Sequence, residues 1–245
     1  MKRTLLCIAI LFLGFNKAFP GVYQNLLEAN KLYENGRFNQ AITIYEDILN
    51  KGYPNPALYY NLANAYFRTK QIGKAVLFYE RAFRLSPRDE DIRFNLKYVR
   101  AFVKEEQSEK GFLFQLLVKV YHFLTLNELT LLTCFLYFSL SIVLTIRLFQ
   151  KKTLVGGLSI FLAATLLLSG FWLSLKIYQE QIKDEAIILQ ESTAFSGPGE
   201  DYLANFSVPE GKKVIILQKR EGWFEIGLLK EGLKGWIKKD MIEKI

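Results

Sequence analysis

The chain has 245 residues, 51% of them apolar and 23% charged, with a formal net charge of +8. This apolar content is too high for a wholly soluble protein, so we expect membrane association. The excess of cations lies beside apolar runs and does not form one dense basic patch, so we expect no nucleic-acid binding. One histidine and two cysteines, both in apolar runs, exclude multi-histidine metal sites and a disulfide framework.

Residues 1–18 have the pattern of a secretory signal peptide. Two cations precede an apolar run from Leu5 to Phe15, which is too short to span a membrane, and Ala18 is a small residue at a plausible cleavage point. The residue three positions before the cut fits the cleavage preference poorly, so an uncleaved anchor remains the alternative. In both cases the following residues are expected to be exported.

Residues 22–106 contain an internal repeat with a period of 34 residues. Segments 22–55 and 56–89 carry matching residues at equivalent positions, which are Ala29 and Ala63, Asn30 and Asn64, Ala41 and Ala75, and Tyr45 and Tyr79. This period and pattern resemble the tetratricopeptide repeat (TPR) family, and the second segment matches better than the first. Residues 90–106 are expected to form a capping helix with a solvated face.

In TPR proteins the first helix of each pair lines a groove that holds a peptide or a partner helix. By this resemblance, the partner-binding groove here would present Asn30, Tyr33, Asn61, Asn64, Phe67, Arg68 and Asn95. Asparagine can hydrogen-bond an extended backbone without requiring a particular sequence, and Arg68 can pair with a carboxylate. The alternative is that these residues are only solvated groove positions.

The segment 112–124 is apolar except for one narrow stripe formed by Gln115, Lys119 and His122. Such a pattern favours an amphipathic helix that lies flat at the membrane surface, although docking against another helix or protein stays open. We interpret His122 as an interfacial polar residue and not as a catalytic one.

Two uncharged runs predict transmembrane helices at 128–148 and 153–175. Thr125 and Glu128 have the spacing of a capping box at the start of the first helix. The loop 147–152 between the helices holds three cations and no acid, so we expect it in the cytoplasm and both flanking regions outside a bacterial cytoplasmic (inner) membrane. Neither run has an ionisable residue at depth, so transport is not expected.

Residues 185–245 contain short β-rich runs separated by glycine, proline and charged turns, which predict a small barrel. The order of SGPGEDY, VPEGKKVIIL, GWFEIGL and EGLKGWIKKDMI resembles the bacterial SH3 family. Lys238 and Met241 stand where proline-binding SH3 domains have other residues, so the resemblance points to cell-wall or protein binding. Candidate residues of an SH3-like ligand face are Tyr202, Trp223 and Trp236, and a role in the barrel core is the alternative for the tryptophans.

The expected fold class is a multi-domain membrane protein with an all-α TPR solenoid, a two-helix transmembrane hairpin and an all-β SH3-like barrel. This order of parts resembles the BatE-type proteins of the Bat (Bacteroides aerotolerance) operon. That resemblance implies a scaffold in an envelope complex linked to oxidative stress, with von Willebrand factor A membrane proteins and a MoxR-type ATPase as partners. A peptidoglycan-binding envelope sensor is the alternative. We expect neither an enzyme nor a cofactor, because the sequence has no phosphate-binding glycine loop, metal-ligand cluster or nucleophile beside a histidine.

Overall fold

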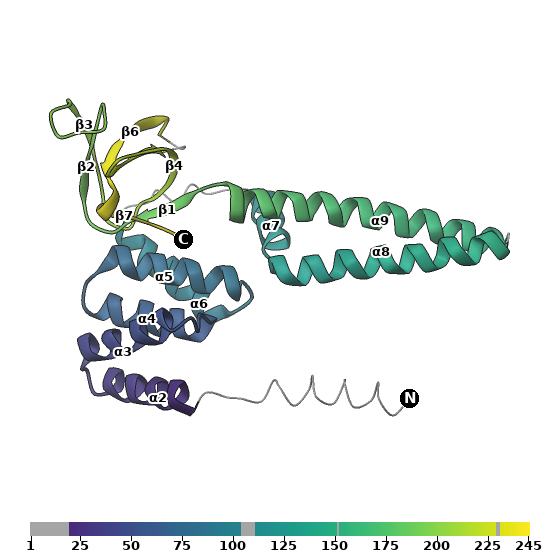
Figure 1. Cartoon of the computed structure of the whole chain (residues 1–245), viewed down its shortest axis with the longest axis horizontal. Coiled ribbons are helices and arrows are strands. Elements are labelled where there is room, and N and C mark those ends of the chain that lie inside the picture. Colours follow the sequence, from purple (N-terminus) through teal and green to yellow (C-terminus); the bar gives the residue numbers. More distant parts are fainter. Residues whose placement is uncertain (1–19, 104–110, 151, 229–230) are drawn as a thin grey trace.

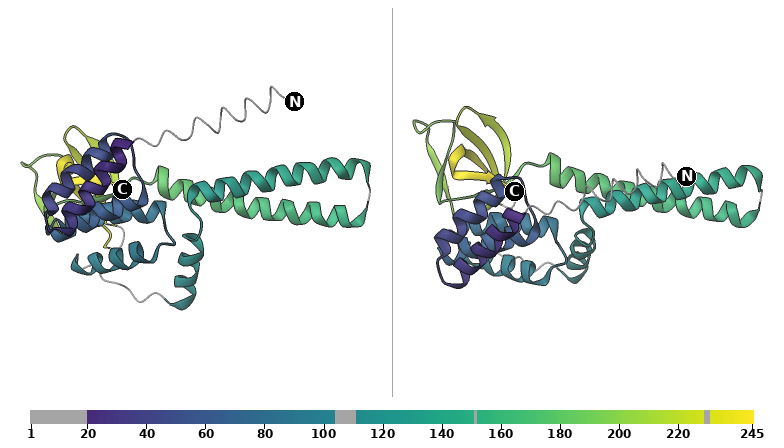
Figure 2. Two further views of the ribbon diagram at one scale, coloured as in Figure 1. Left: turned by 90° about the horizontal axis from the view of Figure 1, so that it is seen from below. Right: turned by 60° about the horizontal axis from the view of Figure 1, so that its bottom comes forward.

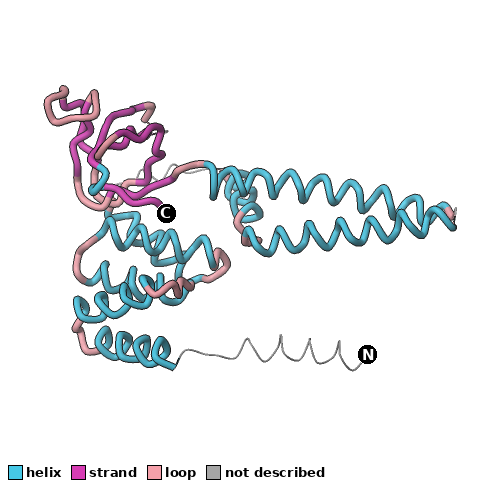
Figure 3. The backbone as a smooth tube through the Cα atoms, in the orientation of Figure 1, coloured by secondary structure: helices cyan, strands magenta, loops and turns pink. Residues whose placement is uncertain are grey.

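The computed structural model describes residues 20–103, 111–150, 152–228 and 231–245. The predicted signal peptide, the last three residues of the predicted cap and Lys151 lie outside the described residues. Figure 1 shows a stack of helices, a long helical hairpin that projects from it, and a barrel above the stack. Figure 3 separates the helical and strand regions, and the predicted fold class is confirmed.

The helical stack consists of α2 (Pro20–Glu34), α3 (Phe38–Asn50), α4 (Pro56–Arg68), α5 (Ile72–Leu85) and α6 (Glu90–Phe102). Local sequence explains where these helices begin. The Asn55 side chain accepts a hydrogen bond from the Leu58 backbone amide at 2.9 Å, and Asp89 caps α6 in the same way. Alanines fill the crossings between helices and are fully buried, including the repeat-related pairs Ala29 and Ala63, and Ala41 and Ala75.

The hairpin is formed by α8 (Leu126–Phe149) and α9 (Thr153–Ile177), with mean hydropathies of 2.2 and 2.1 over their most apolar windows. Both helices are long and apolar enough to cross a membrane. The capping box is present: the Glu128 amide donates to Thr125 Oγ1 at 3.2 Å, and the Thr125 amide donates to Glu128 Oε2 at 2.9 Å. A short π-helix, η2 (Tyr178–Ile182), follows α9 and leads into the barrel.

Helix α7 (Phe112–Tyr121) precedes the hairpin and lies across its base (Figure 2). Seen in the left view of Figure 2, α7 runs transverse to the long axis of α8 and α9. A helix in this orientation would lie in the plane of a membrane that the hairpin crosses, as the amphipathic pattern of segment 112–124 predicts.

The barrel is a seven-stranded antiparallel sheet with the order β3-β2-β6-β5-β4-β1-β7. Its elements are β1 (Glu185–Ile188), β2 (Ser192–Phe195), β3 (Ala204–Val208), β4 (Lys213–Arg220), β5 (Trp223–Leu228), β6 (Leu233–Lys238), the 3-10 turn η3 (Lys239–Met241) and β7 (Ile242–Lys244). The core is aliphatic and includes Ile188, Val214, Ile226 and Ile237. Register shifts interrupt the β2–β3 and β4–β5 pairs, and such irregularities allow a small sheet to curl.

The barrel packs directly on the helical stack, a contact that the sequence does not predict. Ile187 of β1 is fully buried in the same apolar cluster as the core of the helices. A Cβ on Gly73 of α5 would lie 2.6 Å from the carbonyl oxygens of Ile188 and Leu189, so only glycine permits this approach. A Cβ on Gly211 would lie 2.7 Å from a side-chain methyl carbon of Val103, the residue after α6. The barrel therefore occupies the side of α5 and α6 on which a further solenoid helix would pack.

The exposed surface of α6 carries charged residues such as Arg93 and Lys97, and beside them an aromatic stripe. Phe94, Tyr98 and Phe102 lie at helical spacing on one face and are 70%, 51% and 54% exposed. This aromatic stripe was not predicted from the sequence.

Candidate functional site: the solenoid groove and the barrel face

The groove predicted from the repeat is present as a pocket of about 260 Å³ on the helical stack. Its lining residues are Asn30, Tyr33, Glu34, Tyr45, Asn61 and Asn64. Four of these six residues belong to the predicted partner-binding set. They come from the first helices of two successive repeats, α2 and α4, with Tyr45 contributed by α3.

Tyrosines of the second helices hold the groove asparagines in place. The Tyr45 hydroxyl donates to Asn30 Oδ1 at 2.7 Å, and the Tyr79 hydroxyl donates to Asn64 Oδ1. Each pair spans the same 15 positions, so the arrangement repeats with the TPR unit. Because the carbonyl oxygen is fixed by the tyrosine, the amide NH₂ of each asparagine is oriented as a donor. Burial raises the pKa of Tyr45 to about 12, which keeps its hydroxyl protonated as a donor.

Two further asparagines extend the polar lining of the groove. Asn61 Nδ2 donates to Asn30 Oδ1 at 3.1 Å and so links the two repeats. Asn95 of α6 donates to the Tyr60 hydroxyl at 2.7 Å. These side chains are half-buried, which is suitable for a surface that is fixed but still accessible.

The other two predicted groove residues have aromatic neighbours. The ring of Phe67 contacts Tyr98 and Phe102 of α6 edge to face, at centroid distances of 5.8 and 5.5 Å. The guanidinium of Arg68 lies 4.9 Å from the ring centre of Phe38 and is exposed to solvent. The groove region therefore has a hydrogen-bonding pocket lined mainly by asparagines and tyrosines and, on α4 and α6, an aromatic surface.

The three predicted ligand-face residues differ in how far the barrel exposes their side chains to solvent. Tyr202 lies on the β2–β3 loop and is 52% exposed, with its ring packed against Gly197 and Gly199. Trp223 is half-buried and contacts the Phe195 ring edge to face at 5.6 Å. Trp236 is only 6% exposed and is covered by the Arg220 guanidinium, outside the aliphatic core of the barrel, so it does not lie on an open face.

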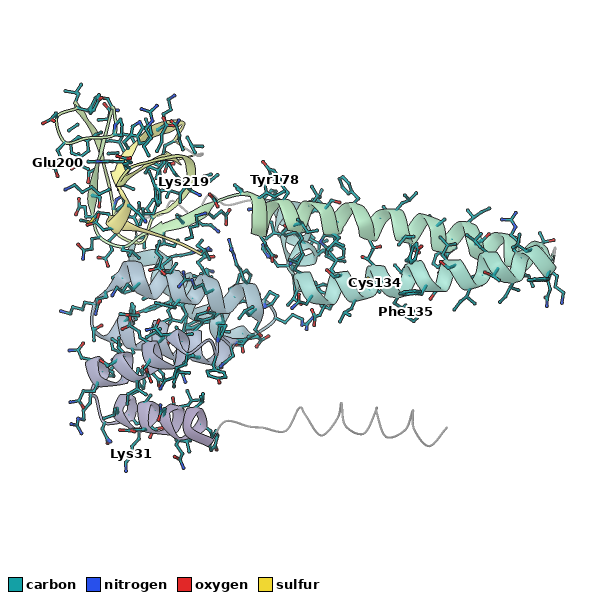
Figure 4. All side chains as sticks on the ribbon, viewed as in Figure 1. Lys31, Cys134, Phe135, Tyr178, Glu200 and Lys219 are labelled. Atoms are coloured by element: carbon teal, nitrogen blue, oxygen red, sulfur yellow. The ribbon has the colours of Figure 1, made fainter. Side chains whose placement is uncertain are left out.

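The loop that carries Tyr202 is tied to the barrel by an ion pair. Glu200, labelled in Figure 4, pairs with Lys238 at the end of β6. Lys238 is one of the two positions at which the chain departs from proline-binding SH3 domains. In this barrel that position anchors the loop.

A buried ionic cluster joins the barrel to the helices. Glu80 of α5 is 3% exposed and pairs with Arg100 of α6 and, at 3.7 Å, with Lys213 of β4. Burial by itself would raise the pKa of Glu80, but these two cations outweigh it and hold the pKa at about 2. Lys213 also pairs with Glu185 of β1 at 2.6 Å. These ion pairs hold the solenoid and the barrel, and with them the groove and the barrel face, in a fixed position relative to each other.

Sequence reasoning missed several of these residues. Tyr45 and Tyr79 were identifiable as repeat positions, but their hydrogen bonds to asparagines 15 positions earlier were not predicted. The aromatic stripe of α6 could have been found from the spacing of Phe94, Tyr98 and Phe102. The role of Glu80 had no sequence signal, because its partners come from α6 and from a strand more than 100 residues away.

Comparison with known proteins supports the repeat assignment. A family model described as a tetratricopeptide repeat matches residues 56–89. Among solved structures, NlpC2 from Trichomonas vaginalis is similar with 22% identity and a TM-score of 0.23, over 25% of this chain and 23% of that one. The C-terminal SH3 domain of myosin IB from Entamoeba histolytica is similar with 23% identity and a TM-score of 0.20, over 26% of this chain and 97% of that one. No curated protein matches the chain.

These findings indicate the broad class of the protein. A tetratricopeptide repeat is a module of protein–protein interaction, which suggests that the chain has protein partners. The two apolar helices suggest association with a membrane.

Proposed function

We propose that the chain is a membrane-anchored adaptor that binds an extended segment of a partner protein in the solenoid groove. The observation that carries the proposal is the repeated Tyr–Asn hydrogen bond, which fixes Asn30 and Asn64 with their amide donors available. Fixed amides can bond the backbone carbonyls of a peptide with little loss of side-chain entropy on binding. The adaptor acts by binding and has no catalytic role.

The hairpin would anchor this adaptor with both modules on one side of the membrane. The solenoid and the barrel contact each other at the same end of the hairpin (Figure 1), so a hairpin that crosses the bilayer leaves them on the same side. The cations at the tip, including Arg147 and Lys152, favour a cytoplasmic tip and therefore extracytoplasmic modules. In this arrangement the chain would recruit exported or membrane-bound partners.

We further propose that these partners belong to a Bat-type envelope complex connected with oxidative-stress tolerance. The support is the order of signal, TPR repeats, hairpin and SH3-like barrel. Partners of this kind would be membrane proteins with von Willebrand factor A domains and, through them, a MoxR-type ATPase.

The experiment that tests the groove is crosslinking of the full chain in its native membrane, followed by mass spectrometry of the captured proteins. The groove variant combines Asn30→Asp and Asn64→Asp, which keep an oxygen that accepts from Tyr45 and Tyr79 but remove the amide donors on which the proposal rests. The control variant makes the same change at exposed positions in the α2–α3 connection and at the start of α3, with Asn35→Asp and Asn39→Asp.

We expect the groove variant to capture about tenfold less of its partners, or less still, because two hydrogen bonds of about 1 kcal/mol each are removed together. The control should capture the same proteins as the unaltered chain. Equal capture by all three proteins would contradict the groove proposal. Absence of von Willebrand factor A proteins among the captured partners would contradict only the Bat-type assignment.

The alternative function is peptidoglycan binding by the barrel, for which the exposed Tyr202 ring is the favourable observation. Aromatic rings on an open surface can stack on sugars. Sedimentation of the detergent-solubilised full chain with purified cell wall separates the alternatives. An adaptor stays in the supernatant, whereas a wall-binding sensor sediments and is released by Tyr202→Ala.

A further inference from the structure

A pocket of about 730 Å³ lies at the base of the hairpin, between α7 and the side of the helical stack. Its lining is of two kinds. Phe83, Phe112 and Leu116 are among its apolar residues, and Arg88, Arg93 and Lys119 are its cations. None of the lining residues is acidic. The pocket therefore combines an apolar wall with an excess of positive charge.

The cations of the pocket differ in whether they form ion pairs with other residues of the chain. Arg88 is held in place, with its two terminal nitrogens 3.1 and 2.5 Å from the Glu128 oxygens and one of them 3.0 Å from the Phe123 carbonyl oxygen. Arg93 and Lys119 are exposed and make no ion pair within the described part of the chain. Two cations that line one pocket and have no counter-charge among the described residues are suited to an anionic group.

The location of the pocket points to the source of that group. The residues that fix Arg88 stand at or just before the start of α8, so the pocket lies where the hairpin would leave the hydrocarbon core. The opposite face of α7 is apolar and exposed, with Leu113 and Leu117 on one helical stripe. This face would contact lipid while the face with Lys119 and His122 closes the pocket against the solenoid.

We propose that this pocket binds an anionic phospholipid. The phosphate would lie between Arg93 and Lys119, and one acyl chain would pack against Phe112 and Leu116. The assignment rests on the membrane insertion proposed above for the hairpin. It explains why α7 has an apolar face on one side and a cationic pocket on the other. We favour a lipid over a protein segment, because an inserted hairpin would place the pocket at the depth of lipid headgroups.

The test uses the full chain in lipid nanodiscs made of phosphatidylcholine alone or of phosphatidylcholine mixed with phosphatidylglycerol, with retained lipids counted by native mass spectrometry. The pocket variant is Arg93→Gln with Lys119→Gln. The control is Lys31→Gln with Lys97→Gln, which changes the net charge equally at exposed positions outside the pocket. We expect the unaltered chain and the control to retain phosphatidylglycerol in preference to phosphatidylcholine. The pocket variant should retain on the order of tenfold less phosphatidylglycerol than the unaltered chain.

A second variant, Leu116→Trp, fills the apolar part and should also reduce retention while the cations remain. Equal retention by the pocket variant and the unaltered chain overturns the proposal. Displacement of the lipid by soluble glycerol phosphate overturns the acyl-chain contact.

Resistance of the chain to alkaline extraction from vesicles is measured in parallel. Extraction of the unaltered chain would contradict membrane insertion, whereas an inserted chain without lipid preference contradicts only this site.

Discussion

The Tyr79 hydroxyl shows how a single residue connects the solenoid core to its groove. Its ring is buried between the helices, whereas its hydroxyl reaches the groove and donates to Asn64. We expect Tyr79→Phe to destabilise the protein by about 1 kcal/mol, because one partly buried hydrogen bond is lost. This corresponds to a fall of about 2–4 °C in the thermal midpoint.

The measurement is thermal unfolding of the detergent-solubilised chain. Tyr98→Phe is the matched control, since Tyr98 is an exposed residue of α6, and its midpoint should not change. A Tyr79→Phe midpoint equal to that of the unaltered chain would mean that the hydroxyl does not hold Asn64.

Glu80 gives the junction of solenoid and barrel a defined pH dependence. Its pKa in the folded chain is about 2, below the ordinary 4.5, so folding favours the ionised form. The stabilisation is fully present above about pH 4.5 and is lost as the pH falls toward 2, by an amount on the order of 3 kcal/mol. We expect Glu80→Gln to reduce the stability at pH 7. Between pH 5 and pH 2.5, the stability of this variant should fall less than that of the unaltered chain.

Midpoints of thermal unfolding measured across this range check the prediction. Glu28→Gln on the exposed surface of α2 is the control. If the unfolding midpoint of Glu80→Gln falls with pH as steeply as that of the unaltered chain, the ionic cluster does not stabilise the junction.

At the scale of elements, α5 and β1 form the contact on which the arrangement of the modules depends. Gly73→Ala places a methyl group 2.6 Å from two backbone oxygens of the barrel, which cannot move aside independently. Alanine is otherwise the better helix former, so a loss of stability would identify the clash as its cause. We expect faster hydrogen exchange in Glu185–Ile188 and in the first turns of α5.

Hydrogen exchange read by mass spectrometry tests this, with Gly21→Ala as the control because no atom lies within 4 Å of the added Cβ. Unchanged exchange of β1 in the Gly73→Ala variant would contradict a close contact between α5 and the barrel.

Elements with a strong local period were predictable from the sequence. The repeated alanines and tyrosines predicted the helix pairs because a TPR unit requires small residues at its crossings, and Thr125 with Glu128 predicted the capping box. The first helices of the repeats supplied most of the groove pocket. Such features depend on neighbours close in the chain or one repeat away.

The remaining features depend on contacts between distant segments, and these were not predictable. The sequence offers both a ligand face and the barrel core for Trp236, and its burial under Arg220 depends on how β4 and β6 lie in the sheet. The packing of the barrel on the helical stack had no sequence signal, because Ile187 of β1 and the helices that bury it are far apart in the chain. Gly73 and Ile187 gave no indication of a shared interface, since each fits its own module.

At the scale of the whole molecule, the chain leaves the solenoid, forms the hairpin and returns to pack its barrel on the solenoid (Figure 1). This return joins the groove and the barrel face into one body at the base of the hairpin. A partner bound in the groove would therefore be presented at a fixed position relative to the barrel and to the membrane.

The most direct test of this account is the distance between the solenoid and the barrel in nanodiscs, measured by pulsed electron paramagnetic resonance. Nitroxide labels replace the exposed Lys31 on α2 and Lys239 on η3, with Cys7 and Cys134 changed to serine. A single body predicts one narrow distance distribution, which broadens when Gly73→Ala is added. A broad distribution in the unaltered chain would contradict the account, because the two modules would then move independently.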